Sequence, residues 1–120
     1  MNKRLDRRLV VYQHAKKLVK IIYRIARKFP KYEEFALGNQ IRRSSVSVCS
    51  NIAEGVGRFS AKDQMHFVEI AYGSLNEMMC QSEIAYESNY IDAEELAEIE
   101  EEYKSISKML SGLRRSLANR

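Results

Sequence analysis

Serine is the residue type in this sequence that most invites a search for a nucleophile. Four serines lie in the segment QIRRSSVSVCSNIAEGVGR, residues 40–58: Ser44, Ser45, Ser47 and Ser50. All four fall inside a predicted helix, without the strained turn that presents a catalytic serine to its substrate. The nearby Gly55-Val56-Gly57 is too short for a phosphate-binding loop and has neither a preceding strand nor a Gly-Lys-Ser/Thr ending. We therefore expect no enzymatic activity and no cofactor.

The two histidines offer little for binding a metal ion. Asp63 and His66 have the spacing found in ferritin-like sites, but those sites need two Glu-x-x-His motifs and further carboxylates on facing helices. His14 has no carboxylate three residues before it. Cys49 and Cys80 stand alone, without a Cys-x-x-Cys pair, and we expect both to be reduced and half-buried. The sequence predicts no metal site.

Three arginines remain as candidates for binding a ligand. Arg42 and Arg43 could hold phosphate groups with their forked donors. Alternatively, one of this pair, together with Arg58, bonds Glu54 or a carboxylate such as Glu77 and ties the helices together. We favour the ion pair for Arg58, and both alternatives stay open for Arg42 and Arg43.

A larger basic surface is predicted on the first helix. Its polar face carries six cations, and no acid lies between Asp6 and Glu33 to offset them. Such a one-sided face either keeps a protein in solution or contacts a polyanion. The candidate nucleic-acid-binding residues are therefore Lys16, Lys17, Lys20, Arg24, Arg27, Lys28, Arg42 and Arg43.

Charge is divided unevenly along the chain. Residues 1–62 contain 15 Lys and Arg against 4 Asp and Glu, a balance of +11, whereas residues 63–120 contain 5 against 12, a balance of −7. The basic half favours an anionic partner such as RNA or DNA. The alternative is electrostatic pairing between the two halves, within one subunit or between subunits.

The elements that position these residues are predicted to be long helices. One proline and five glycines leave few places for the chain to turn, and apolar residues recur at steps of three and four. Ser60 with Asp63 and Asp92 with Glu95 have capping-box spacing. We expect helices over about residues 6–29, 37–55, 61–88 and 93–118 in a single domain of residues 1–120. The short connections predict an all-α, antiparallel, up-down-up-down four-helix bundle.

The second helix is predicted to have two contact faces. One row is apolar and belongs in the bundle core: Leu37, Ile41, Ser45, Val48 and Ile52. The other row is polar: Gln40, Ser44, Ser47, Asn51, Glu54 and Arg58. We expect the polar row to meet polar positions of the third helix or another subunit. Gly73, Ser74 and Glu77 are the candidate partners, and Gly73 would allow a close approach of backbones.

The hydropathy of the chain argues against a membrane protein. No segment approaches the roughly 18 to 20 apolar residues of a membrane span. The N-terminal sequence has no apolar block of the signal-peptide type. We expect no membrane contact and a cytoplasmic protein.

Several motifs of the chain resemble one protein family. They are LVVYQHAKKLVKIIY, the FP that follows, QIRRSSVSVCSNIAEGVGR and FVEIAYGSLNE. Over about residues 9–87 this pattern resembles the four-helix-bundle proteins encoded by intervening sequences in bacterial large-subunit ribosomal RNA genes. That family is similar in turn to the accessory proteins of diversity-generating retroelements. Cys49 stands where the family often has proline.

The resemblance implies a ring-like homo-oligomer, a homopentamer, with a basic surface proposed to bind nucleic acid. In the retroelement relatives it implies association with a reverse transcriptase and RNA, and the family offers no established catalytic residues. Residues and resemblance together predict a non-enzymatic, homo-oligomeric bundle that binds nucleic acid, RNA in particular, through the basic face of its first helix. The alternative is an assembly protein whose uneven charge serves subunit contacts without nucleic acid.

Overall fold

Helices make up the regular secondary structure of the described part of the chain. A computed structural model describes residues 3–120, with side chains from Arg7 onward. The elements are α1 (Lys3–Ala26), the short 3-10 helix η1 (Lys31–Glu33), α2 (Leu37–Val56), α3 (Ala61–Glu87) and α4 (Ala93–Ala118). The predicted all-α class is confirmed.

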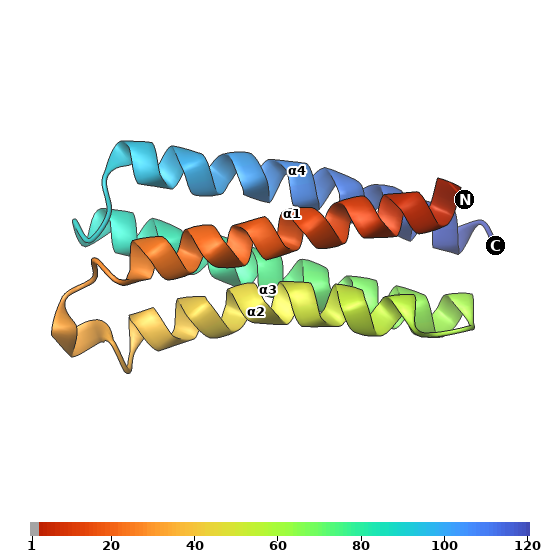
Figure 1. The fold of residues 1–120 in the computed structure, drawn as a ribbon, viewed down its shortest axis with the longest axis horizontal. Coiled ribbons are helices and arrows are strands. Elements are labelled where there is room, and N and C mark those ends of the chain that lie inside the picture. The colour runs from red at the N-terminus through yellow and green to blue at the C-terminus, as the bar shows by residue number, and fades with distance from the viewer. Residues whose placement is uncertain (1–2) are drawn as a thin grey trace.

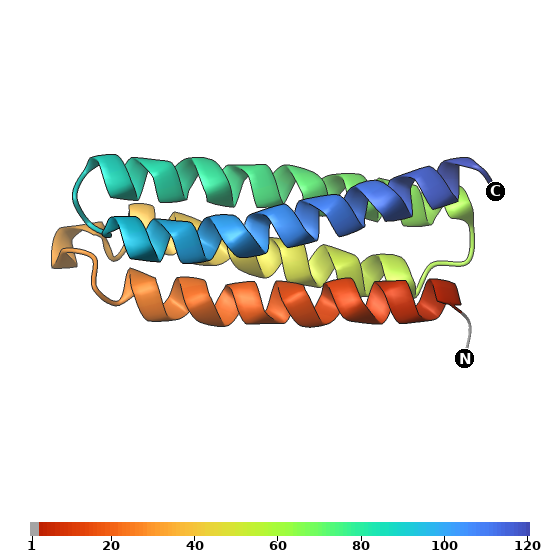
Figure 2. The same cartoon turned by 90° about the horizontal axis from the view of Figure 1, so that it is seen from above.

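The four long helices lie side by side in an elongated bundle of 46 × 24 × 20 Å. In Figures 1 and 2, the connections α1–α2 and α3–α4 lie at one end, which we call the turn end. The α2–α3 connection and both ends of the chain lie at the other, which we call the terminal end. Helix α1 packs against α2 and α4, and α3 packs against the same two helices. The chain's first and last helices are therefore neighbours.

The boundaries of α1 differ from the predicted residues 6–29. The helix begins at Lys3 and ends at Ala26. Beyond it, the amides of Lys28 and Phe29 donate to the carbonyls three residues back, at 3.0 and 3.1 Å. Pro30 follows with ψ of 146°, an extended conformation. Because proline disfavours helical geometry at the preceding residue, the chain tightens into this 3-10 turn before reaching it. The other three helices begin and end within one residue of their predicted limits.

Capping side chains fix the starts of α3 and α4. The Asp92 carboxylate accepts from the Glu95 amide at 2.8 Å, while the Glu95 carboxylate accepts from the Asp92 amide at 3.0 Å. This reciprocal pair is the predicted capping box. At α3 the Ser60 hydroxyl accepts from the Asp63 amide at 3.0 Å. Each cap satisfies amide groups that have no partner within the helix.

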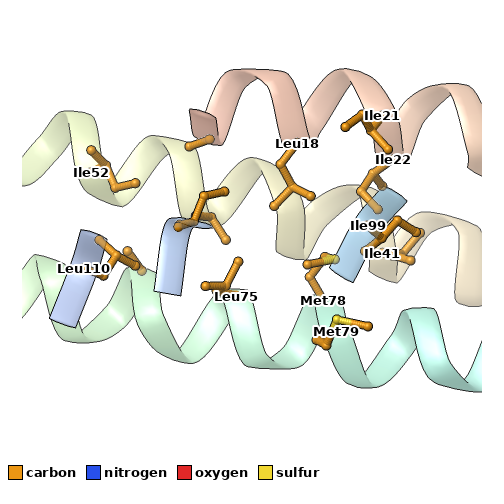
Figure 3. Packing of buried hydrophobic residues seen from close by; sticks show 14 of the residues in the cluster. Leu18, Ile21, Ile22, Ile41, Ile52, Leu75, Met78, Met79, Ile99 and Leu110 are labelled. Carbon is orange, nitrogen blue, oxygen red and sulfur yellow. The ribbon is translucent and has the colours of Figure 1, made fainter. Parts of the chain in front are cut away.

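The core is built from apolar stripes of all four helices. Figure 3 shows Leu18 and Ile22 of α1, Ile41 of α2, Leu75 and Met78 of α3, and Ile99 and Leu110 of α4 converging on the bundle axis. The predicted apolar row of α2 is buried throughout. In α4 the buried apolar residues are Ile99, Ile106, Leu110, Leu113 and Leu117. Steps of three and four residues place these side chains on one helix face, so burial follows the sequence spacing.

Aromatic residues join the two connections at the turn end. The Tyr90 hydroxyl donates to Glu33 Oε2 at 2.8 Å and lies 3.2 Å from the Tyr32 hydroxyl. The Tyr90 ring packs on Phe29, with centroids 5.6 Å apart. The hydrogen bonds with Tyr32 and the Glu33 carboxylate raise the pKa of Tyr90. These contacts connect the α1–α2 segment to the α3–α4 turn.

Two leucines of α1 test the assignment of the core. Leu18 is 0% exposed and Leu9 is 44% exposed. We expect Leu18→Ala to lower the free energy of unfolding by about 2–5 kcal/mol, because it leaves a cavity at the bundle axis. Leu9→Ala should lower it by only about 0.5 kcal/mol. Urea unfolding followed by circular dichroism measures both, and equal losses would contradict this assignment of the core.

Candidate functional site

The six cations predicted on the first helix divide between two edges of α1, which for Arg27 and Lys28 continue into the turn after its last residue, Ala26. One edge faces the acidic first half of α4 and makes three ion pairs. They are Arg24 with Glu98 at 2.6 Å, Lys28 with Glu95 at 2.8 Å and Lys17 with Glu102 at 3.4 Å. Three of the six predicted cations are therefore neutralised inside the subunit, by acids that lie 67 to 85 residues away in the sequence.

Glu102 is the most deeply placed acid of this edge. Its side chain is 6% exposed, with Oε1 on His14 Nδ1 and Oε2 facing Lys17 Nζ. A carboxylate removed from water needs such partners for both oxygens, because an unpaired buried charge is costly. The sequence drew attention to His14 but not to Glu102. In sequence, Glu102 is one of a run of acids, and only the packing of α1 on α4 distinguishes it from its exposed neighbours.

Hydrogen bonds and charge shift the pKa values of two side chains along this edge. The hydrogen bond from Lys28, with the bond from the Asp92 amide, lowers the pKa of Glu95. The hydrogen bond to Glu98 and the negative charge of that carboxylate raise the pKa of Arg24. Both shifts favour the charged forms. The Arg24–Glu98 pair is exposed on both sides, so it contributes little to stability.

The second edge of α1 keeps its positive charge. Lys16, Lys20 and Arg27 are exposed, and no described carboxylate lies within ion-pair distance of them. The Lys16 ammonium lies 5.3 Å from the ring centroid of Tyr12. Lys16 and Lys20 line a shallow depression that we call the α1–α2 groove. Its residues are Tyr12, Lys16, Val19, Lys20, Val46, Cys49, Ser50 and Ala53.

Arg42 and Arg43 are adjacent in sequence but lie against different parts of the protein. Arg42 donates from Nη2 to the Glu34 carbonyl at 2.9 Å, so it holds the α1–α2 connection. Arg43 is exposed and lines a polar groove between α2 and α3. That groove also contains Gln40 and Glu77. The structure therefore does not bring the two arginines together to hold one ligand.

The polar row of α2 packs on α3 of the same chain. Ser44 donates to Gln81 Oε1 at 2.7 Å, and the Ser47 and Ser74 hydroxyls lie 2.8 Å apart. Asn51 donates to the Ser47 carbonyl at 2.8 Å. Gln81, which no sequence pattern singled out, is 7% exposed. These bonds place the buried Ser44 and the half-buried Ser47 and Ser74 in structural contacts, since a polar group in a helix interface needs a partner.

At the far end of the same row, Glu54 and Arg58 pair with each other, and Arg58 lies just beyond the last residue of α2. Arg58 forms an ion pair with Glu54, one turn earlier, and its guanidinium lies 4.9 Å above the ring of Phe67. Both side chains of the pair are exposed. The predicted ion pair of Arg58 is therefore present, but because both partners are exposed it contributes little to stability.

Glycine allows a close approach of α2 and α3 at Gly55, not at the predicted Gly73. A Cβ atom on Gly73 would have no neighbour within 4 Å, so the close backbone approach predicted there is wrong within the subunit. A Cβ on Gly55 would lie 3.2 Å from the Cβ of Phe67. Gly55 was expected to end the helix, but it lies inside α2 and allows α3 to come near.

Metal-binding chemistry finds no support in the described part of the chain. No group of three or more His, Cys, Asp or Glu side chains gathers there in a way that could hold a metal ion. His66 packs edge-on against Phe67, with centroids 5.1 Å apart. Cys49 is half-buried, whereas Cys80 is exposed, contrary to expectation. None of the helices has a stretch apolar enough to span a bilayer, over the residues described.

Comparison with known proteins identifies the family. The family model described as "23S rRNA-intervening sequence protein" matches residues 7–112. The chain belongs to this family. The family resemblance stated from the sequence motifs is thereby confirmed. No curated protein matches the chain.

A solved structure supports the fold of this family member. It is a protein of unknown function from the S23 ribosomal protein family of Bacteroides thetaiotaomicron. The two structures superpose with a TM-score of 0.84 at 24% sequence identity, covering 91% of this chain and 98% of the other. The agreement over nearly the whole length of both chains shows that they share the four-helix bundle.

Glu95 allows a test of the α1–α4 ion pairs by pH. Because its pKa is lowered in the folded state, its contribution to stability is full above the unfolded-state pKa of about 4.3 and is lost as the pH falls through the lower folded value. We expect Glu95→Gln, which keeps a capping side chain, to reduce the free energy of unfolding at pH 7 by about 0.5–1 kcal/mol. The difference from the parent should shrink below about pH 4.

Glu94 provides the matched control for this measurement. It lies in the same turn of α4 and is exposed, and no described cation lies within ion-pair distance of it. Urea unfolding at a series of pH values should show a smaller change in pH dependence for Glu94→Gln than for Glu95→Gln. Identical profiles for the two variants would mean that the Lys28–Glu95 pair contributes nothing.

Proposed function

We propose that this protein is a non-enzymatic, homo-oligomeric bundle that binds nucleic acid, RNA in particular, along the α1–α2 side of its surface. One observation carries the proposal: Lys16, Lys20 and Arg27 are exposed without an acidic partner among the described residues, while the other three α1 cations are paired with α4. The interface that we propose for nucleic acid is therefore one edge of α1, and not the whole basic face predicted from the sequence.

Physical chemistry explains why the unpaired edge suits a polyanion. Cations that already have carboxylate partners must lose them before they can contact phosphate groups. Unpaired cations bind phosphates directly, and the binding is driven by release of the counterions condensed on the nucleic acid. Apolar and aromatic side chains between the cations, such as Tyr12 and Val19, add surface on which bases can pack. The name of the family, which refers to 23S rRNA, favours RNA over DNA.

Two triple variants with the same change in net charge test the proposal. We expect the variant K16A/K20A/R27A to bind single-stranded RNA more weakly than the parent. The slope of log K against log salt should fall by about 0.7 for each phosphate group that the variant can no longer neutralise. The variant K17A/R24A/K28A removes the paired edge and should retain most of the binding. Fluorescence anisotropy at several salt concentrations, with circular dichroism to check folding, measures both.

The comparison separates a localised interface from a general effect of charge. Equal weakening in the two variants would mean that the net charge alone matters. Parent-like binding by K16A/K20A/R27A at every salt concentration would overturn the proposal.

The alternative function, assembly without nucleic acid, is favoured by a separate observation. Apolar side chains are exposed in and beside the α1–α2 groove: Leu9 is 44%, Val46 37% and Val56 38% exposed. On α4, Glu94 and Glu101 are exposed, and no described cation lies within ion-pair distance of them. In this alternative, the basic and apolar surface of one subunit meets these acids on a neighbour.

Mass measurements at two salt concentrations test the assembly alternative. We expect the parent to form an oligomer that loosens in high salt, because exposed charge pairs are screened beyond about 8 Å at physiological ionic strength. The variant E94Q/E101Q should shift the distribution toward the monomer, whereas E83Q/E87Q, which removes two exposed acids from α3, should not. Native mass spectrometry reports the subunit count directly. A monomer at every salt concentration would contradict self-association.

A further inference from the structure

Two arginines converge at the terminal end of the bundle on a single neutral oxygen. Arg8 of α1 donates from Nη1 to Gln64 Oε1 at 3.4 Å, and Arg120 donates from Nη1 to the same oxygen at 3.3 Å. Gln64 is 7% exposed, and its amide nitrogen donates to the Arg58 carbonyl at 2.8 Å. The glutamine is therefore held from the α2–α3 connection with its oxygen directed at both arginines.

The charge of these two cations is not balanced by any side chain that the structure describes. Among the side chains described, no carboxylate lies within ion-pair distance of Arg8 or Arg120. The hydrogen bonds that Arg8 and Arg120 make to Gln64 are long, and both go to the same amide oxygen. Two guanidinium groups that share a neutral acceptor repel one another, and none of the described side chains offsets that repulsion with a negative charge.

Arg8 also has a donor atom without a hydrogen-bond acceptor among the described residues. Its Nε is buried and has no hydrogen-bond partner in the described part of the protein. A buried donor without an acceptor costs free energy, and native proteins rarely retain one. The helix dipole does not explain the placement, because Arg8 lies toward the N-terminal end of α1, where a dipole does not favour a cation.

We propose that Arg8 and Arg120, oriented by Gln64, bind a phosphate group. A tetrahedral oxyanion offers several acceptor oxygens, so it can accept hydrogen bonds from both guanidinium groups and supply a negative charge that the described side chains do not provide. Arginine suits this role because its planar fork of donors matches phosphate geometry. Gln64 acts as a positioning residue, since it holds the two side chains together without neutralising them.

The site lies at the end of the α1–α2 groove. Arg8 and Tyr12 line a hollow with Leu9, Ala53 and Val56, and Tyr12 and Ala53 also belong to the groove. Arg8, Lys16 and Lys20 follow one another along α1 over about 18 Å. A single strand lying in the groove would thus bring its end to the two arginines.

A terminal phosphate monoester is the group that best fits this location. It carries about −1.5 to −2 charges at pH 7, more than a phosphate within the strand. This assignment of the source rests on the proposed function, whereas the phosphate site itself does not. Free phosphate or a nucleotide offers the same chemistry, and the experiment distinguishes these sources.

Short RNA oligonucleotides of one sequence provide the test. They carry a 5′-phosphate, a 3′-phosphate or neither, and inorganic phosphate serves as the free ligand. We expect the parent to bind one phosphorylated form about tenfold or more tightly than the unphosphorylated form. This preference should be lost in R8Q and in R120Q. The control R114Q, which removes a nearby arginine that pairs with Glu69 at 3.6 Å, should keep it.

Folding is checked separately for each variant. R8Q removes a buried donor without an acceptor, so its urea midpoint should equal or exceed that of the parent. Arg120 is exposed beyond the end of α4, so R120Q reports on the site even if R8Q is destabilised. Thermal shifts with inorganic phosphate, present in the parent and in R114Q but absent in R8Q and R120Q, give a readout that does not require RNA.

The outcomes separate this site from the proposed function. Loss of phosphate binding in R8Q and R120Q, in a protein that binds no RNA, would overturn the proposed function and support the site. Binding of inorganic phosphate through Arg8 without any preference among the RNA ends would support the site with free phosphate as its source. Equal responses to every phosphate probe in the parent, R8Q and R120Q, or no response in the parent, would overturn the site.

Discussion

The contact between the acidic first half of α4 and one edge of α1 determines which charges of this protein remain available to a partner. Glu95, Glu98 and Glu102 pair with Lys28, Arg24 and Lys17, and the buried Glu102 carboxylate also binds His14. Because a carboxylate at 6% exposure needs partners for both oxygens, this contact also fixes the rotation of the two helices about their axes. The cations on the opposite edge of α1 are then directed away from α4 and toward the α1–α2 groove. Part of the charge asymmetry between the two halves of the sequence is thus balanced inside one subunit, and the cations and acids that remain unpaired lie at the surface.

Most of the fold could be predicted from local rules. The spacing of Ile99, Ile106 and Leu110 places them on one face of α4, and Asp92 with Glu95 marks where that helix begins, so burial and boundary both follow from short segments. The candidate site could be predicted only in part, since the sequence shows that Lys17 and Lys20 are polar positions but not which neighbour each one faces. Glu102 and Gln64 are ordinary polar residues in sequence, and their burial results from the packing of helices that lie far apart along the chain. The close packing predicted at Gly73 was wrong for the same reason, because a glycine allows close packing only where another helix passes beside it.

The hydroxyl and amide groups between α2 and α3 have a role beyond stability. Ser44 with Gln81 and Ser47 with Ser74 are matched pairs, and sliding one helix along the other would leave buried polar groups without partners. Apolar seams alone tolerate such shifts more readily, since one leucine can replace another as a neighbour. The polar row of α2 therefore specifies the register of the pair.

The adjacency of the chain's first and last helices has a consequence for how the bundle forms. Contacts between α1 and α2, α2 and α3, or α3 and α4 join elements that follow each other in sequence, whereas the α1–α4 contact closes a loop of roughly a whole domain. Loop closure over a long segment carries an entropic cost that must be met before the two helices can stabilise one another. A basic helix and an acidic helix attract one another over distances longer than the range of apolar interactions, and this attraction favours their encounter. We therefore expect the docking of α1 on α4 to be the slowest step in the folding of the bundle. The rate of this step should decrease as the ionic strength rises.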